Sequence, residues 1–108
     1  MIDNPAHVDR LQARITAALP LSALLTPPLI TLLQDQKPGR TVPPACVIEE
    51  VTYAGDEGGI VCRFLVGPDA DDLVLASITH LKFDPRHPLT REIVLYQKRR
   101  TKRIRRQG

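Results

Sequence analysis

Residues 45–66 read ACVIEEVTYAGDEGGIVCRFLV, and this stretch decides the fold. Its two halves, 45–54 and 59–66, are rich in the β-branched and apolar residues typical of strands. The loop between them, 55–58, reads GDEG and carries the glycines that a tight hairpin turn requires. We therefore expect an antiparallel hairpin whose strands occupy the full length of both segments.

The two cysteines lie on the two strands of this hairpin. We expect Ala54 to pair with Gly59 across the turn. In that register Cys62 lies opposite Val51, and Cys46 lies opposite Gly67, beyond the end of the second strand. A disulfide needs Cα atoms within about 7 Å of one another. The register therefore predicts two free, buried thiols, as is usual in a reducing compartment.

Residues 72–83 follow a second turn, 67–71, and continue the meander as a third strand. The first half of this strand, 73–78, reads LVLASI and is apolar on both faces. A strand that is apolar on both faces is usually covered on both. We therefore expect helices or a partner subunit to cover it on each side.

Two helices precede the hairpin. Residues 4–5, Asn-Pro, are typical of an N-cap and a first helical position, and residues 26–27, Thr-Pro, repeat the signal. Pro20 ends the first helix, and residues 37–39, KPG, end the second. The second helix is apolar on most sides, so we expect it to be buried or to form an interface. Its candidate interface residues are Leu29, Ile30, Leu32 and Leu33.

The segment 89–104 is compatible with a helix or with a fourth strand. Pro88 suits a helix start, and Leu89, Ile93 and Tyr96 recur at helical spacing. The run 93–96, IVLY, also suits a strand. No turn residues follow this run, which favours the helix.

Together these signals predict an α+β fold: two N-terminal helices, a three-stranded antiparallel β-meander and a basic C-terminal helix. The chain of 108 residues fits one domain, 1–108, with an aliphatic core, since it has two tyrosines, two phenylalanines and no tryptophan. No apolar run approaches the roughly 20 residues that span a bilayer, and no signal peptide is recognisable. We expect a cytoplasmic protein with no membrane partner.

Charge is divided unevenly along the chain. Residues 91–108 hold eight basic residues and one acid, a net charge of about +7, whereas residues 1–90 hold seven basic and eleven acidic residues. The basic end predicts a polyanionic partner or an acidic surface. We expect residues 98–108 to form an exposed extension, with no core-facing stripe, that can be removed without loss of the fold. Its candidate nucleic-acid contacts are Lys98, Arg99, Arg100, Lys102, Arg103, Arg105 and Arg106. A structural interpretation is a solvated tail, or one that pairs with Asp69, Asp71 and Asp72.

Residues that could carry chemistry are few. On a continuous strand His80, Lys82 and Asp84 share one face, and His87 follows in the loop. Such a group could act as a general base or bind a metal, but hydrogen bonding and turn capping account for it more simply.

Two adjacent glutamates, Glu49 and Glu50, point to opposite faces of a strand and cannot act as a carboxylate pair. If both faces are covered, one glutamate is buried and needs a cation such as Arg63. The sequence contains no phosphate loop, no dinucleotide-binding motif and no Gly-x-Ser-x-Gly. It therefore predicts no enzyme, no cofactor and no metal site.

We predict a small intracellular, non-enzymatic protein that acts by binding another macromolecule, with a homodimer as one form of that binding. The alternative hypothesis is a DNA- or RNA-binding protein that uses its basic C-terminal helix for phosphate contacts. A third hypothesis is a hydrolase or metal protein built on His80, Asp84 and His87.

Overall fold

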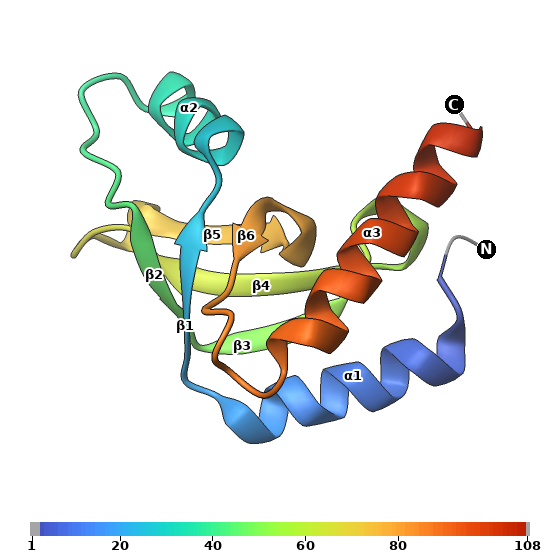
Figure 1. The fold of residues 1–108 in the computed structure, drawn as a ribbon. Helices are drawn as coiled ribbons and strands as arrows, with labels where there is room; N and C mark the ends of the chain where they lie inside the picture. The colour runs from blue at the N-terminus through green and yellow to red at the C-terminus, as the bar shows by residue number, and fades with distance from the viewer. Residues whose placement is uncertain (1–2, 108) are drawn as a thin grey trace.

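The computed structural model describes the backbone of residues 3–107 and the side chains of residues 3–104. Its helices and strands, in chain order, are α1 (Pro5–Ala18), β1 (Leu21–Leu25), α2 (Pro27–Gln36), β2 (Ala45–Ile48), β3 (Glu50–Tyr53), β4 (Ile60–Leu65), β5 (Leu73–Ser77), β6 (Leu81–Lys82) and α3 (Thr90–Gln107). The described strands form two antiparallel sheets of three strands each, in the orders β2-β1-β6 and β3-β4-β5 (Figure 1). The predicted α+β class is confirmed.

The β3–β4 hairpin has the predicted register. Val51 pairs with Cys62, and the Ala54 N–H donates to the Gly59 carbonyl oxygen at 2.8 Å. Gly55 and Gly59 have positive φ angles of 64° and 65°, which residues with side chains rarely adopt. β5 pairs with the other edge of β4, so β3, β4 and β5 form an antiparallel meander with shorter outer strands than predicted.

The prediction of one strand over 45–54 is wrong, because the strand breaks at Glu49 into β2 and β3, which belong to different sheets. Continuous alternation would turn one of the two adjacent glutamates toward the core. The break leaves Glu49 and Glu50 both exposed, and Glu50 pairs with Arg63 at 3.3 Å on the outer face. The predicted buried glutamate–arginine pair is therefore also wrong.

Both cysteines are buried and free, as predicted, but Cys46 lies elsewhere than expected. It pairs with Ala23 of β1 instead of with β4. Burial raises the pKa of the Cys46 thiol to about 11 and that of the Cys62 thiol to about 12. Both thiols are therefore protonated and weakly reactive near neutral pH.

A short strand that sequence reasoning missed, β1, joins the two N-terminal helices. Leu21, Ala23 and Leu25 are buried, whereas Ser22 and Leu24 are exposed. β1 is the middle strand of its sheet, with β2 and β6 on either side. Its five residues lie between two prolines, so the local pattern resembles a linker.

The prediction of one strand over 72–83 is wrong as well. β5 ends at Ser77, residues Ile78–His80 form a 3₁₀ turn, and β6 belongs to the other sheet. Alternate residues of β5 face the core, but Leu75 is 67% exposed on the opposite face. No element in the described part of the chain buries this face, so β5 is an edge strand with an apolar outer face, and the expectation of cover on both faces is wrong for this chain alone.

The first two helices begin where predicted. Asn4 Oδ1 accepts hydrogen bonds from the N–H groups of Ala6 and His7 at 3.0 and 3.4 Å, and α2 begins at Pro27. The candidate interface residues of α2 separate into buried Leu29 and Leu33, half-buried Ile30 and exposed Leu32.

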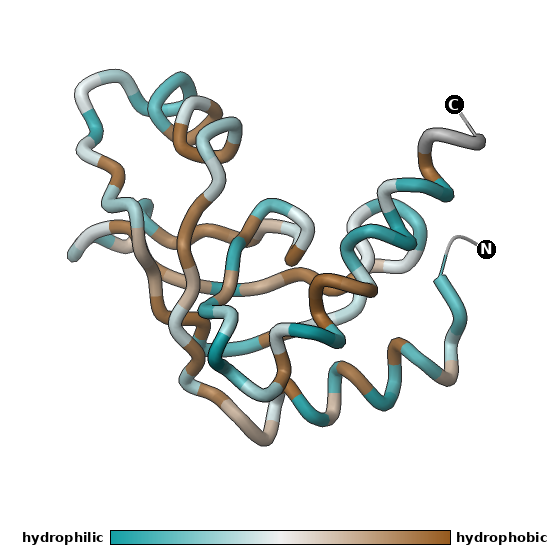
Figure 2. The backbone as a smooth tube through the Cα atoms, viewed as in Figure 1, coloured by the Kyte–Doolittle hydropathy of each residue, from teal (hydrophilic) through white to brown (hydrophobic). Residues whose placement is uncertain are grey.

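The last segment is a helix, α3, so the alternative of a strand at 93–96 is wrong. Leu89, Ile93 and Tyr96 are buried, as predicted. In Figure 1, α1 and α3 lie on one side of the molecule, and α2 lies apart from both. Figure 2 shows apolar residues along the strands and in the first part of α3, whereas most of the rest of α3 is hydrophilic. In the described part of the chain, no helix combines the length and apolar character needed to cross a membrane.

Candidate nucleic-acid interface

A buried ion pair holds α3 against the rest of the protein. Arg100 is 3% exposed, and its Nη1 donates to Asp3 Oδ2 at 2.8 Å. The hydroxyls of Tyr53 and Tyr96 donate to the same carboxylate oxygen at 3.0 and 3.1 Å. Arg100 Nη2 also donates to the Asp56 carbonyl oxygen at 2.8 Å. Hydrogen bonds therefore satisfy both members of the pair, as buried charges require.

The hairpin turn makes room for this ion pair. A Cβ atom at Gly59 would overlap the Tyr96 hydroxyl and lie 2.8 Å from Arg100 Nε. The Tyr96 hydroxyl also accepts the Ile60 N–H at 3.1 Å. Burial raises the pKa of Tyr96 to about 12, so its hydroxyl keeps the proton that it donates to Asp3. The turn glycine thus serves both the hairpin and the docking of α3.

The expectation that residues 98–108 form an exposed extension fails at Arg100, which is buried. This residue shares a helix side with Leu89 and Tyr96, but its partner Asp3 is 97 positions away in the chain. Because Arg100 is buried, its guanidinium is not open to a ligand. Removal of residues 98–108 would also leave the Asp3 carboxylate buried without its cation. We therefore expect this truncation to destabilise the fold.

The remaining described cations of α3 face solvent. α3 has 18 residues, which corresponds to a length of about 27 Å. Its exposed cations are Arg91, Lys98, Arg99, Lys102 and Arg103. The side chains of Arg105 and Arg106 lie outside the described residues.

Basic side chains of α1 lie next to those of α3, which sequence reasoning missed. His7, Arg10 and Arg14 are exposed, and their spacing puts them on one side of α1. Arg14 forms an ion pair with Glu92 of α3, and His7 Nδ1 lies 3.5 Å from Arg99 Nη1. The i, i+3, i+7 spacing of basic residues is the sequence signal that could have revealed this face. We define the basic surface as Arg10, Arg91, Lys98, Arg99, Lys102 and Arg103.

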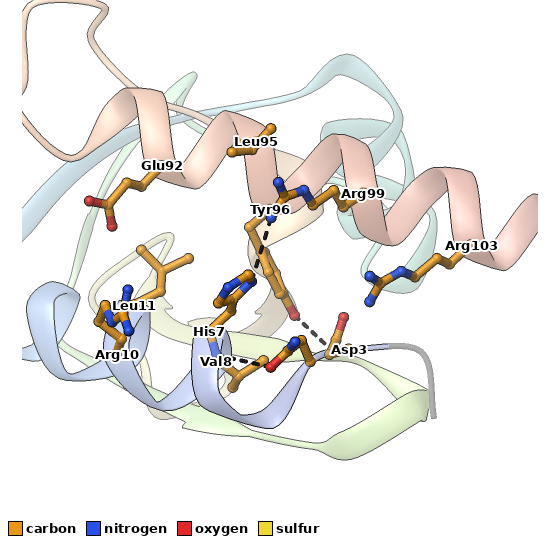
Figure 3. Close-up of a pocket in the computed structure, with 11 residues that line it drawn as sticks. Asp3, His7, Val8, Arg10, Leu11, Glu92, Leu95, Tyr96, Arg99 and Arg103 are labelled. Carbon is orange, nitrogen blue, oxygen red and sulfur yellow. Dashed lines mark hydrogen bonds between the residues drawn. The ribbon is translucent and has the colours of Figure 1, made fainter.

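A cleft of about 210 Å³ lies between α1 and α3 (Figure 3). Its walls include the apolar side chains of Leu11 and Leu95, and Arg10 lines it from α1. Figure 3 shows Arg99 and Arg103 extending from α3 toward α1, with the Arg99–His7 contact crossing the cleft. The tertiary structure thus brings cations from both ends of the chain to one hollow.

The aspartates at 69–72 pair with other cations instead of with the basic end. Lys37 Nζ lies 3.1 Å from an Asp71 oxygen and 3.7 Å from an Asp72 oxygen, and Arg40 Nε lies 3.7 Å from Asp72. The hydrogen bond from Lys37 lowers the pKa of Asp71. Asp69 and Asp72 cap each other's backbone in a reciprocal box. The interpretation that these acids hold the basic tail is not supported.

Of the group His80, Asp84 and His87, the last two stabilise the turn before α3. The 3₁₀ turn at Ile78–His80 ends the continuous strand that was expected to give His80, Lys82 and Asp84 a common face. Asp84 Oδ1 accepts the Arg86 N–H at 2.9 Å, which lowers the pKa of Asp84.

His87 contributes to the same turn, because its Nδ1 accepts the Leu89 N–H at 3.1 Å. Within the described residues, no group of three or more histidines, cysteines, aspartates or glutamates is placed to hold a metal ion.

Comparisons with protein-family models, curated proteins and solved structures found no match to this chain. The functional argument therefore rests on the geometry of the basic surface and the cleft.

Proposed function

We propose that this is a non-enzymatic binding protein whose basic surface contacts the phosphate backbone of duplex nucleic acid. The observation that carries the proposal is the buried Arg100–Asp3 pair, because it fixes a helix of exposed cations beside the cations of α1. Cations that are ordered before binding lose less conformational entropy when they meet phosphates.

Contact with a duplex backbone suits this surface better than stacking on single strands. Phe64, Phe83 and Tyr96 are buried, and Tyr53 is half-buried. Binding to single strands relies on exposed rings, whereas phosphate contacts need only closely spaced cations. We therefore expect little preference for base sequence.

The salt dependence of binding tests this proposal. If five residues of the basic surface contact phosphates, a plot of log affinity against log salt should have a slope near −4.5, about −0.9 for each contact. Fluorescence anisotropy with a labelled duplex, between about 50 and 200 mM NaCl, measures this slope. Substitutions are the right perturbation, because truncation of α3 would also remove the buried Arg100.

A pair of charge-matched variants makes the test specific. Lys98→Gln/Lys102→Gln removes two exposed cations from α3 and should flatten the slope by about 2. The control, Arg63→Gln/Arg86→Gln, removes two exposed cations from β4 and from the loop before α3, and should change the slope little. Equal effects of the two variants, or no binding by the wild type at low salt, would contradict the proposal.

A second candidate function, self-association into a homodimer, is favoured by the free edge of β5. The Val66 N–H donates to the Asp72 carbonyl oxygen at 3.0 Å, which sets the phase of the β4–β5 ladder. In that phase the backbone polar groups of Leu73, Leu75 and Ser77 face away from β4. Two copies of β5 that pair antiparallel around Leu75 would satisfy these groups and cover their exposed leucines.

Light scattering tests this second candidate against the chain mass of 12.0 kDa. Leu75→Lys should convert the dimer to a monomer, since Leu75 is 67% exposed and its replacement leaves the core intact. The control is Leu24→Lys on β1, which belongs to the other sheet and where the side chain is 52% exposed. A wild type that remains monomeric at high concentration would rule out the homodimer.

A further inference from the structure

The cleft between α1 and α3 is not needed for contact with the side of a duplex. A hollow of about 210 Å³ between two helices is too narrow for a duplex, yet it is open to solvent and can admit one small charged group. Arg10, Arg99 and Arg103 all line it. These arginines come from two helices, so the cleft exists only in the folded chain.

The acids that line the cleft are already neutralised by arginines outside its lining. The carboxylate of Asp3 lies 2.8 Å from Arg100 Nη1, and Glu92 forms an ion pair with Arg14. Arg10 and Arg99 therefore add positive charge that these two acids do not cancel.

Arg10 and Arg99 lack carboxylate partners among the described residues. The contact that Arg99 does make is with His7, whose Nδ1 lies 3.5 Å from Arg99 Nη1. This contact positions the Arg99 guanidinium at the cleft, as Figure 3 shows. An anion in the cleft would accept hydrogen bonds from the guanidinium N–H groups that Arg99 does not use in this contact. The apolar walls at Leu11 and Leu95 would strengthen such contacts by excluding water.

We propose that this cleft binds a phosphate monoester, the group found at the end of a phosphorylated nucleic-acid strand. Guanidinium groups match phosphate oxygens in bidentate pairs. A monoester carries about 1.5 to 2 negative charges at neutral pH and projects from its strand, so it can enter a narrow hollow. An internal phosphate is flanked by sugars on both sides and cannot. That the monoester belongs to a nucleic acid rests on the proposed function. In this arrangement the end of the duplex lies at the cleft, and the backbone of the duplex runs along α3.

Three duplexes of one sequence test the inference, with 5′-phosphate, 3′-phosphate or only hydroxyl groups at their ends. The wild type should bind one of the phosphorylated duplexes about tenfold more tightly than the hydroxyl-ended duplex. Arg10→Gln and Arg99→Gln should each lower this ratio toward one, whatever they do to overall affinity. Lys98→Gln/Lys102→Gln should weaken binding of all three duplexes by the same factor, so the ratio between phosphorylated and hydroxyl-ended duplexes should stay unchanged.

AMP and adenosine separate this inference from the proposed function. Calorimetry should detect binding of AMP but not of adenosine to the wild type. Arg99→Gln should abolish the binding of AMP, whereas Arg63→Gln should leave it unchanged. AMP binding without any duplex binding would keep the phosphate cleft and overturn the proposed function. Duplex binding with equal affinity for all ends, together with no AMP binding, would overturn the cleft inference and keep the proposed function.

Discussion

Replacement of Asp3 by asparagine should destabilise the protein by about 3–5 kcal/mol, the usual cost of removing one partner of a buried ion pair. Asp3 is 5% exposed, and Asp3→Asn would leave the Arg100 guanidinium, 3% exposed, without its counter-charge. Domains of this size are stable by about 5–15 kcal/mol in total, so the loss is a large share. The same change should loosen α3 and, with it, the basic surface.

Urea unfolding followed by circular dichroism measures this loss, and a thermal melt should show a fall of at least about 12 °C. The matched control is Glu50→Gln, which breaks the exposed pair with Arg63 at 3.3 Å and should cost less than about 1 kcal/mol. Adding Arg100→Met to Asp3→Asn should recover part of the loss, because no uncompensated charge then remains buried. If Asp3→Asn costs no more than Glu50→Gln, the ion pair does not hold α3, and the basis of the proposed function fails.

Three further predictions concern the turn, the thiols and the tyrosine. Gly59→Ala should cost about 2 kcal/mol or more in thermal melts, since its Cβ would overlap Tyr96 at a positive φ of 65°. The control Gly39→Ala, where φ is 87° and nothing lies within 4 Å, should cost only about 1 kcal/mol. Cys46 and Cys62 should react with a disulfide reagent at pH 8 only as the protein unfolds, because burial raises their pKa values to about 11 and 12; fast labelling of the native protein would contradict their burial. Burial in the folded protein raises the pKa of Tyr96 from 10.0 to about 12. The stability that the neutral Tyr96 hydroxyl contributes to the folded protein is therefore complete below pH 10 and is lost as the pH rises toward 12. The urea midpoint should therefore fall over that range, and an equal fall in Tyr96→Phe would exclude Tyr96 as a source of it.

The features of the fold that sequence reasoning predicted correctly depend on neighbouring residues. Positive φ angles at Gly55 and Gly59 set the hairpin turn, and the turn sets the register as far as Val51 and Cys62. Asn4 caps α1 because its side chain reaches the next two free N–H groups. Capping and turn formation act over a few residues, so the local sequence is enough to predict them.

The predictions that failed concern contacts between distant segments. The strand break at Glu49 keeps two adjacent carboxylates in water, and it transfers β2 to a sheet with β1. The five residues of β1 form a strand because β2 and β6 supply hydrogen-bonding partners on both sides. Leu75 remains exposed because no described element covers the outer face of β5. None of these outcomes is visible in a short window of sequence.

The candidate site was also predicted only in part from the sequence. Sequence predicted a helix with basic residues at its end, and Lys98, Arg99, Lys102 and Arg103 are exposed on α3. It did not predict that Arg10 of α1 lies across a cleft from Arg99. The spacing of cations on each helix is local, but the distance between the two helices is set by packing.

The sequence alone determined the starts of α1 and α2, the hairpin register and the uneven distribution of charge, because each depends on residues close together in the chain. Only the tertiary structure decided which cations a ligand could reach. Arg100 belongs to the same basic run as Lys98 and Lys102, yet it is buried, because Asp3, 97 positions away, supplies the opposite charge beside it. A charged side chain can be buried only where the fold supplies a partner, and that partner can come from any part of the chain.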